Sequence, residues 1–208
     1  MKTTPSMTTA NCPIVCLLDD DTTERNSLAR LVNTRGWRPE TFGSAPEFLL
    51  WRRPATPCCL VLDMEPSGVR GLELQQQLSD QPDLPVIFLS SGGDVPTAVQ
   101  AMKAGAVEFL TRPFGDEALL GAVSVALERS RAIQGEQSVR QELQRRYQSL
   151  TRREREVMAL VVSGLLNKQV GGELGISEIT VKAHRGQVMR KMQADSLAHL
   201  VTMAARLR

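Results

Sequence analysis

The sequence predicts an α/β domain with a doubly wound, five-stranded parallel sheet, followed by a small all-α domain with helix-turn-helix geometry. Two observations carry this prediction. Short apolar runs typical of buried strands alternate with helical patterns over residues 12–130, as in a parallel sheet covered by helices. Residues 150–208 show helical patterns throughout and no strand pattern.

The distribution of charge supports the same division. Residues 1–130 contain 11 Lys and Arg against 16 Asp and Glu, whereas residues 131–208 contain 14 against 7. The net charge of +2 for the whole chain therefore hides an acidic first part and a basic second part. A basic segment indicates a polyanionic partner such as nucleic acid, although surplus arginine also occurs on ordinary solvated surfaces.

We expect five strands in the first domain, and four of them are visible as apolar runs. The runs 14–18 and 59–62 lead to aspartates, respectively Asp19 to Asp21 and Asp63. The run 86–89 leads to Ser90, and the run 107–110, which contains Phe109, precedes Arg112. Acid, acid, hydroxyl and cation thus follow four successive strands.

Helical patterns lie between these strands. Asp21 is a candidate N-cap for the first helix and Gly36 a candidate C′ residue. The polar segment 131–149 has thin apolar spacing, and we interpret it as a partly helical linker. Helices are expected at residues 21–35, 44–49, 71–79, 96–104 and 116–127.

Other global features are simple. No segment approaches 18 uninterrupted apolar residues, so no membrane span is predicted. The Thr-rich residues 1–11 lack a signal-peptide core and are expected to be disordered, which favours a cytoplasmic protein. The four cysteines lack CxxC spacing, and we expect Cys58 and Cys59 to be buried free thiols facing opposite sides of the sheet.

The aspartates form a candidate metal site, because ligands of such folds bind at the carboxyl ends of the strands. Asp19, Asp20 and Asp63 are therefore expected at one edge of the sheet. Two carboxylates about 4 Å apart repel by roughly 4 kcal/mol at an effective dielectric constant near 20, so the cluster holds protons or a cation. A few oxygen ligands suit hydrated Mg²⁺, and they suggest acyl-phosphate formation on an aspartate.

Residues 12–130 resemble the receiver domain of bacterial response regulators. The resemblance implies that Asp63 accepts a phosphoryl group. Asp20, Asp63 and the backbone carbonyl of Glu65 would bind Mg²⁺, with Asp19 acting through water, and Ser90 and Phe109 would be switch residues. The most specific matches are Leu18-Asp19-Asp20-Asp21, Val61-Leu62-Asp63-Met64, and Ala101-Met102-Lys103-Ala104-Gly105-Ala106 followed by Glu108-Phe109-Leu110.

Two positions depart from the receiver pattern. Arg112 stands where the family has a lysine, and its guanidinium is a planar fork instead of a compact ammonium. Pro66 is shifted by one position from the family's usual Met-Pro-Gly, beside the metal site. The resemblance also implies a cis Arg112-Pro113 bond. A receiver-like fold that has lost phosphorylation remains an alternative.

The second domain carries a helix-turn-helix pattern. Residues 151–154 form a capping-box sequence, and helices at 167–174 and 178–192 are joined by the turn Gly175-Ile176-Ser177. In the second of these helices, apolar residues recur at the spacing of a buried face. The outer face of the same helix has the size and charge that suit a DNA major groove. The core positions are Val181, Val188 and Met192, and the outer face holds Lys182, Ala183, Arg185, Gly186 and Gln187.

Residues 150–208 resemble a LuxR-type output domain. The resemblance implies that Lys182 and Ala183 contact base edges, with Arg185 and Gln187 supplying specificity beside Gly186. Lys168, Thr180 and Lys191 would contact phosphates, whereas His184 either braces the helix or contacts DNA. The matches are Leu150-Thr151, Arg153-Glu154, Glu156-Val157, Gly164, Asn167-Lys168-Gln169, Leu174-Gly175-Ile176-Ser177, Thr180-Val181-Lys182, His184 and Lys191.

A receiver followed by a LuxR-type domain is the architecture of FixJ/NarL-type response regulators, and the receiver is most similar to the FixJ branch. The expected partners are a sensor histidine kinase, double-stranded promoter DNA, RNA polymerase and a second copy of the chain, with Mg²⁺ as cofactor. One alternative is a DNA-binding regulator independent of phosphorylation, with a degenerate receiver. Others are an interaction module and an aspartate-nucleophile phosphohydrolase. Such enzymes need an aspartate where Glu65 stands, so we expect a non-enzyme.

Overall fold

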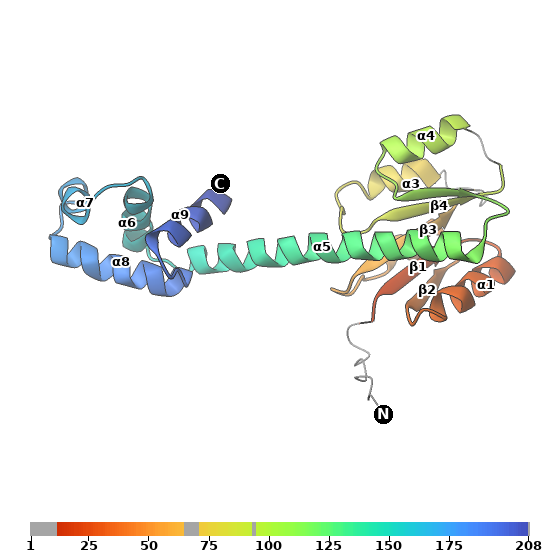
Figure 1. The fold of residues 1–208 in the computed structure, drawn as a ribbon, viewed down its shortest axis with the longest axis horizontal. Helices are drawn as coiled ribbons and strands as arrows, with labels where there is room; N and C mark the ends of the chain where they lie inside the picture. The colour runs from red at the N-terminus through yellow and green to blue at the C-terminus, as the bar shows by residue number, and fades with distance from the viewer. Residues whose placement is uncertain (1–11, 65–70, 93–94, 208) are drawn as a thin grey trace, which may run out of the picture. The chain divides into compact units, whose positions relative to one another are not determined.

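The computed structural model describes residues 12–64, 71–92 and 95–207 (Figure 1). The chain divides into two compact units, with the boundary between Gln134 and Gly135. Across the described ranges, no helix is long and apolar enough to cross a membrane. The disorder expected for residues 1–11 lies outside the described residues, as do Glu65 and the shifted Pro66.

The first unit contains the predicted five-stranded parallel sheet, in the order β2-β1-β3-β4-β5. The sequence did not locate β2, which lies at an edge of the sheet. Its residues Arg38, Glu40 and Thr41 are polar, so it has no apolar run. The strands are β1 (Ile14–Leu18), β2 (Arg38–Phe42), β3 (Cys58–Asp63), β4 (Val86–Ser90) and β5 (Glu108–Thr111).

Helices cover both faces of this sheet (Figure 1). One face packs against α2 (Ala45–Leu50), α3 (Gly71–Gln77) and α4 (Val95–Lys103). The opposite face packs against α1 (Thr22–Asn33) and the first part of α5 (Asp116–Gln148). Every residue of β1, β3 and β4 is buried, as expected for strands covered on both sides.

Local signals in the sequence set the ends of α1. The Asp21 carboxylate accepts hydrogen bonds from the backbone N–H groups of Thr23 (2.7 Å) and Glu24 (3.3 Å), which confirms its role as N-cap. After the helix, Gly36 has a φ of +75°, a left-handed conformation that glycine adopts without a steric penalty. Asp21 thus places the N-terminus of α1 next to the carboxyl end of β1, whereas Gly36 follows the other end of the helix.

The helix α5 is longer than the sequence indicated. It continues without interruption to Gln148, so the segment 131–149 is not a partly helical linker but the continuation of α5. Glu, Gln, Arg and Leu are strong helix formers, and Glu142 pairs with Arg146 four residues later at 3.0 Å. Good helix propensity therefore maintains the helix where its apolar pattern is weak.

Buried polar groups attach α5 to the first unit. The Ser130 hydroxyl, which is completely buried, accepts a hydrogen bond from Cys58 N–H (3.0 Å) and donates one to the carbonyl of Asp83 (2.6 Å). One turn later, Gln134 donates to the carbonyl of Thr56 at 3.2 Å. The first unit ends at this residue, where the side chains of α5 cease to reach the sheet.

In the described residues, the second unit consists of the last part of α5 and four further helices, and Leu143 of α5 belongs to its core. The Thr151 capping box is present, because Thr151 accepts from Glu154 N–H and Glu154 accepts from Thr151 N–H. Gly175 ends α7 with a φ of +65° and so turns the chain toward α8. The helices are α6 (Arg152–Val162), α7 (Asn167–Leu174), α8 (Glu178–Met192) and α9 (Leu197–Arg206).

The cysteines are free thiols in different environments. Cys58 belongs to the core on the α2–α4 face and Cys59 to the core on the α1–α5 face, as predicted from their adjacency. Burial raises the pKa of the thiols of Cys16, Cys58 and Cys59. Cys12 is only half-buried.

We predict that Cys12 alone reacts with a thiol reagent in the native protein. A buried thiol of raised pKa is neutral and inaccessible at neutral pH, whereas the thiolate is the reactive form. The measurement is titration with Ellman's reagent at pH 7.5, before and after unfolding in urea. One equivalent should react in the native state and all four after unfolding, and Cys12→Ser should remove the native signal. Rapid native reaction of Cys16, Cys58 or Cys59 would contradict the described packing.

Candidate functional site

The parallel topology brings the predicted acidic residues to the carboxyl edge of the sheet. Asp19 directly follows β1 and is 1% exposed, and Asp63 is the last residue of the neighbouring β3 and is 9% exposed. Arg112 follows β5, and its backbone N–H donates to the carbonyl of Ser90 at 2.8 Å. The Arg112-Pro113 peptide bond is cis, which confirms the prediction.

The guanidinium of Arg112 lies among three carboxylates. Its Nη2 atom is 3.6 Å from Asp19 Oδ2, 3.9 Å from Asp63 Oδ2 and 2.5 Å from Glu24 Oε2. The guanidinium also lies 5.6 Å from the centre of the Phe114 ring. Arginine at this position therefore reaches Asp63, the residue that the resemblance predicts to accept a phosphoryl group.

The sequence analysis missed Glu24. This residue lies in the first turn of α1, three residues after the N-cap Asp21, and its carboxylate forms the shortest of the three ion pairs with Arg112. The only signal in the sequence was an acidic residue in the first turn of a helix that begins near the end of β1. Acidic residues are common in the first turn of helices, because their charge interacts favourably with the helix dipole.

The electrostatics of the pocket favour a cation. Burial raises the pKa of the Asp19 carboxyl, while the hydrogen bond from Asp21 N–H and the charge of Arg112 partly oppose the shift. Asp19 Oδ2 is buried and accepts no hydrogen bond from the residues that the structure describes. Two converging carboxylates with such an oxygen are a suitable donor set for a hard cation.

The structure brings together only part of the predicted Mg²⁺ ligand set. Asp19 and Asp63 converge on the same nitrogen of Arg112, whereas Asp20 is exposed beside them and Glu65 lies outside the described residues. Within the described ranges, no group of three or more His, Cys, Asp or Glu side chains is arranged to hold a metal ion. The described donor set is thus two carboxylates.

The two predicted switch residues lie on adjacent strands. Ser90 ends β4, is 4% exposed, and its hydroxyl donates to the carbonyl of Gly92 at 2.9 Å. Phe109, on β5, is half-buried, and its ring centre is 6.3 Å from that of Phe88. Ser90 thus lies at the edge that bears the carboxylates, and Phe109 extends from the core toward the side covered by α4.

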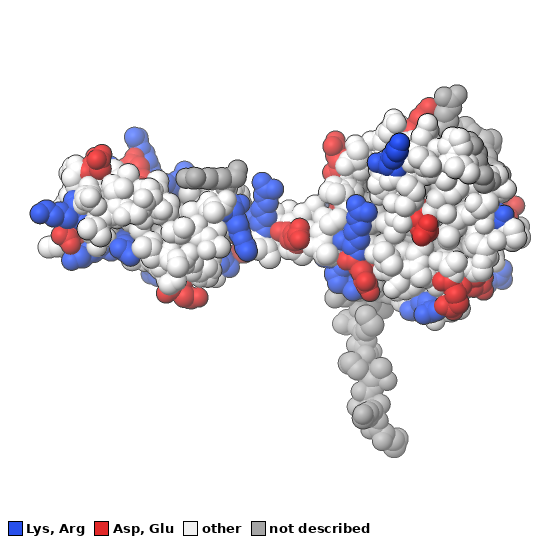
Figure 2. All heavy atoms as spheres, turned by 45° about the horizontal axis from the view of Figure 1, so that its top comes forward, with Lys and Arg blue, Asp and Glu red and all other residues white. Residues whose placement is uncertain are grey.

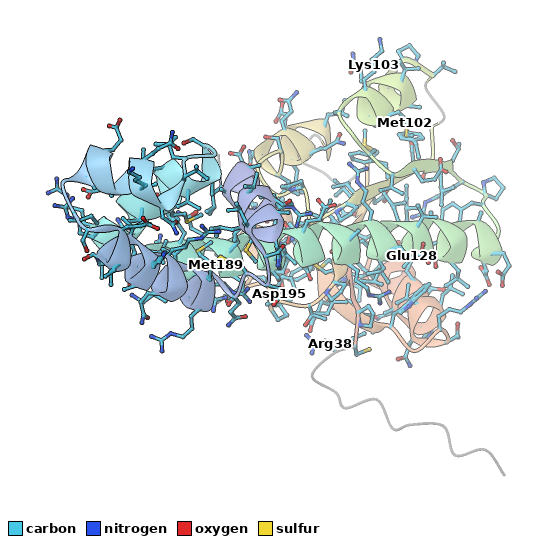
Figure 3. The ribbon with its side chains drawn as sticks, turned by 60° about the vertical axis from the view of Figure 1, so that its left-hand side comes forward. Arg38, Met102, Lys103, Glu128, Met189 and Asp195 are labelled. Carbon is cyan, nitrogen blue, oxygen red and sulfur yellow. The ribbon has the colours of Figure 1, made fainter. Side chains whose placement is uncertain are left out.

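The surface of α4 beside Phe109 is apolar. Val95, Val99 and Met102 are exposed by 71%, 44% and 45%, which is unusual for a helix whose opposite side contacts a sheet. Figure 3 labels Met102 near the C-terminal end of this helix, beside Lys103. We call Val95, Val99 and Met102 the α4 patch.

In the second unit, α8 has the two faces that the sequence predicted. Val181, Val188 and Met192 are buried and pack into two small cores of the unit. The outer face of α8 projects into solvent (Figure 3). Its exposed residues include Lys182, Ala183, Gly186 and Gln187.

The glycines of the helix-turn-helix have different roles. A Cβ atom at Gly171 would lie 2.8 Å from the backbone oxygen of Ile176, so glycine is required for α7 to pack against the turn. A Cβ atom at Gly186 would meet no other heavy atom within 4 Å. Packing within the unit therefore does not explain the glycine in the middle of α8.

Of the two residues predicted to contact phosphates besides Lys191, Lys168 is exposed and Thr180 is half-buried. Lys168 is exposed in the first turn of α7, and the Thr180 hydroxyl lies 2.9 Å from that of Ser177 at the start of α8. His184 is half-buried on the same helix. Lys and Arg side chains, with some acidic groups among them, are spread over the surface of this unit in Figure 2.

Several of the predicted DNA contacts already have protein partners. Lys182 Nζ lies 3.1 Å from Glu178 Oε1, and Arg185 donates to the side-chain oxygen of Asn167 at 3.1 Å. Gln187 accepts a hydrogen bond from Arg190 at 2.5 Å. All three side chains lie on or beside the outer face, and these contacts hold them against other residues of the unit.

Lys191 differs from the others, because its partner is buried. Its Nζ atom lies 2.7 Å from Glu154 Oε2 and 3.3 Å from the carbonyl of Ser149, and Glu154 is 5% exposed. Burial raises the pKa of the Glu154 carboxyl, but hydrogen bonds from Lys191 and Thr151 outweigh that effect and hold the pKa below its usual value. Lys191 therefore joins α8 to α6 inside the unit.

Comparison with known proteins agrees with this division. Residues 15–124 match the family model of the response regulator receiver domain, and residues 148–204 match that of bacterial regulatory proteins of the luxR family. The chain belongs to the response regulators that join a receiver domain to a LuxR-type DNA-binding domain.

Within that class, the relatives include regulators of FixJ type. Nodulation protein W of Bradyrhizobium diazoefficiens is 45% identical over 93% of this chain and 86% of its own length. The transcriptional regulatory protein FixJ of Azorhizobium caulinodans is 41% identical over 91% of this chain and 90% of its own. The low-resolution structure of the response regulator StyR is 43% identical, with a TM-score of 0.86 over 94% of this chain and 99% of that one.

We predict that the Glu154–Lys191 pair makes the stability of the second unit depend on pH. A carboxyl whose pKa is lower in the folded state contributes stability above its unfolded pKa, near 4.5, and loses it as pH falls through the folded value. Glu154→Gln should therefore lower the free energy of unfolding by about 1–3 kcal/mol at pH 7. The difference from wild type should shrink below pH 4.5.

Urea unfolding of the full chain, followed by circular dichroism between pH 3 and pH 7, measures this difference. Glu156→Gln is the matched control, since Glu156 pairs with Arg152 and Arg153 on the surface of the same helix, where water screens the interaction. A gap between wild type and Glu154→Gln that stays constant over this range would show that the ion pair does not contribute.

Proposed function

We propose that this response regulator controls transcription by binding promoter DNA, and that phosphorylation of Asp63 by a sensor histidine kinase controls the binding. The observation that carries the proposal is the convergence of Asp19, Asp63 and the guanidinium of Arg112 at one edge of the sheet. The protein would act in the cytoplasm, as a regulator and not as an enzyme.

Mg²⁺ is the proposed cofactor of phosphorylation. Asp19 and Asp63 would hold it, together with Asp20 and the backbone carbonyl of Glu65. When bound, the ion would neutralise negative charge on the phosphoryl oxygens. A carboxylate oxygen of Asp63 would attack the phosphorus atom of the kinase's phosphohistidine, forming a P–O bond while the P–N bond breaks and the imidazole leaves. Arg112, less than 4 Å from that carboxylate, can pair with the transferred group.

A phosphoryl group on Asp63 changes the balance of charge in the pocket. The acyl phosphate carries up to two negative charges in place of the single charge of the free carboxylate, and it brings three acceptor oxygens. Arg112 would then move from Glu24 toward the phosphoryl group, and the Ser90 hydroxyl would exchange its bond to Gly92 for a phosphoryl oxygen. Because Arg112 directly follows β5, this movement acts on the strand that carries Phe109.

The proposed output of the switch is a dimer. Repacking of Phe109 would alter the α4 patch, whose exposed valines and methionine suit burial against a second copy of the chain. A dimer presents two α8 helices to paired half-sites on DNA. Dimerisation therefore links the receiver to promoter binding and, through the promoter, to RNA polymerase.

On DNA, α8 would occupy the major groove. Lys182 and Ala183 would contact base edges, flanked by Arg185 and Gln187, and His184 would lie at the margin of the contact. Lys168 and Thr180 would contact phosphates. Because Lys191 pairs with the buried Glu154, we leave it out of the proposed phosphate contacts.

One observation favours a second function, in which the protein binds DNA independently of phosphorylation. Arg112 forms its shortest ion pair with Glu24, so the cation of the pocket is already neutralised before any phosphoryl group arrives. If that pair persisted in the presence of a phosphoryl donor, concentration or partner binding would set the output. The following experiment separates the two functions.

We predict that the full chain takes up one acid-labile phosphate from acetyl phosphate in the presence of Mg²⁺, and that Asp63→Asn takes up none. The dimer fraction, measured by analytical ultracentrifugation, should rise on phosphorylation of the wild type only. Arg112→Lys tests the cation, and a larger dimer fraction in this variant would identify arginine as the weaker coupling group. Absence of phosphate in the wild type, with the same DNA affinity as Asp63→Asn, would support the second function instead.

We predict that DNA binding resides in residues 150–208 and falls steeply with salt. About six phosphate contacts per dimer correspond to a loss of roughly 10³ in affinity between 50 and 200 mM salt. Lys182→Ala should cost about 1–3 kcal/mol and relax the preference at one base pair. The test is fluorescence anisotropy with duplexes selected from a random library. Salt-independent affinity, or none, would contradict DNA binding by this unit.

We also predict opposite effects of Gly186→Ala on stability and on DNA affinity. Alanine in the middle of a helix should stabilise the unit by up to about 1 kcal/mol, because the added Cβ enters open space. The same Cβ should weaken DNA binding if α8 approaches the bases closely. Gly121→Ala in α5, also in open space, is the control and should leave DNA affinity unchanged. Unchanged affinity in Gly186→Ala would exclude a close approach there.

A further inference from the structure

Ile179 is an exposed apolar residue with no evident role in the fold. It is the second residue of α8, and 80% of its surface is accessible, the largest exposure among the large hydrophobic residues of the described second unit. A β-branched residue also has lower helix propensity than the Glu, Lys or Arg that usually occupies such a surface. Stability therefore does not explain isoleucine at this position.

The position of Ile179 places it on the outer face of α8. It precedes Lys182, Ala183 and Gly186 by three, four and seven residues, which is the spacing of one stripe along a helix. The buried residue Val181 lies on the opposite side. Ile179 is thus continuous with the face proposed above to enter the major groove, at its N-terminal end.

Ile179 and its charged neighbours on this stripe differ in the contacts that they can make. Lys182 and Glu178, which flank Ile179, pair with each other at 3.1 Å, so the charged groups nearest to Ile179 are held together. Ile179 itself has no group that can hydrogen-bond to a base. Its β-branched side chain has few rotamers, so little conformational freedom is lost when it is fixed in a contact.

We propose that Ile179 is a specificity-determining residue that packs against the 5-methyl group of a thymine in the major groove. Thymine is the base that presents an apolar group there, and apolar side chains recognise it by contact. The inference rests on the proposed DNA-binding function and adds one base preference to it. Each half-site would contain a thymine near the N-terminus of α8, beside the base pair contacted by Lys182.

The test is a double-substitution cycle. It removes either the methyl group of the thymine or most of the Ile179 side chain, singly and together. The full chain is bound to duplexes selected from a random library, in which each thymine of the half-site is replaced singly by deoxyuridine, the same base without its methyl group. At one position the wild type should lose about fourfold in affinity per subunit, the fold-change that corresponds to one buried methyl group. Ile179→Ala should bind the unmodified duplex more weakly and be insensitive to deoxyuridine at that position.

Val139→Ala, a change of another exposed apolar side chain outside the helix-turn-helix, is the matched control. It should keep the affinity and the deoxyuridine penalty of the wild type. Thermal unfolding of both variants verifies that they fold, which is expected because both side chains are exposed.

Three outcomes overturn the inference. The first is a wild type that tolerates deoxyuridine at every position, and the second is an Ile179→Ala variant that retains the full penalty. The third is an Ile179→Ala variant with unchanged DNA affinity but lost transcription activation, which would assign the residue to a protein partner. A chain that binds none of the selected duplexes would instead refute the proposed function itself, so the two failures are distinguishable.

Discussion

The burial of two carboxylates at the carboxyl edge of a parallel sheet is the constraint on which the first unit depends. Asp19 and Asp63 reach the same place because β1 and β3 are adjacent and parallel, and both residues are almost completely buried. Such a pair requires positive charge, and Arg112 supplies it from the end of β5. The ends of three strands, β1, β3 and β5, therefore meet in one group of charges.

The sequence predicted much of this site because strand ends are visible as apolar runs that stop at a polar residue. Asp19, Asp63, Ser90 and Arg112 were all placed in that way, and the cis bond before Pro113 followed from the resemblance. Glu24 could not be predicted in the same way, because a first-turn acid is common at helix starts. The direction of its side chain depends on packing that no local pattern encodes.

The remaining errors also have physical causes. The strand β2 lies at an edge, where polar residues are tolerated and leave no apolar run. The length of α5 depends on propensity and ion pairs and not on amphipathic spacing, so the segment 131–149 looked like a linker. The contact between Lys191 on α8 and the buried Glu154 on α6 was an omission, because the spacing of Lys191 on its helix gives no indication that its ammonium reaches another helix. Pairs between elements distant in the sequence are set by tertiary contacts.

The basic residues of α8 in the second unit fall into two groups, those with a buried partner and those with a partner at the surface. The Glu154–Lys191 pair joins α6 to α8, while Lys182 and Arg185 remain on or beside the outer face with partners at the surface. Breaking a buried pair leaves an uncompensated charge, whereas a surface pair is easily exchanged for a phosphate or a base. The difference in burial thus separates Lys191, which maintains the fold, from the cations whose protein partners lie at the surface.

The central claim is that the charge state of the acidic pocket determines how tightly the second unit binds DNA. The most direct measurement is the affinity of the full chain for one selected duplex, by fluorescence anisotropy, before and after treatment with acetyl phosphate and Mg²⁺. We expect the affinity of the wild type to increase by about 5- to 150-fold, the usual range of coupling between two sites, and that of Asp63→Asn to stay constant. Equal affinities of the treated and untreated wild type, with phosphate demonstrably bound to Asp63, would contradict the account.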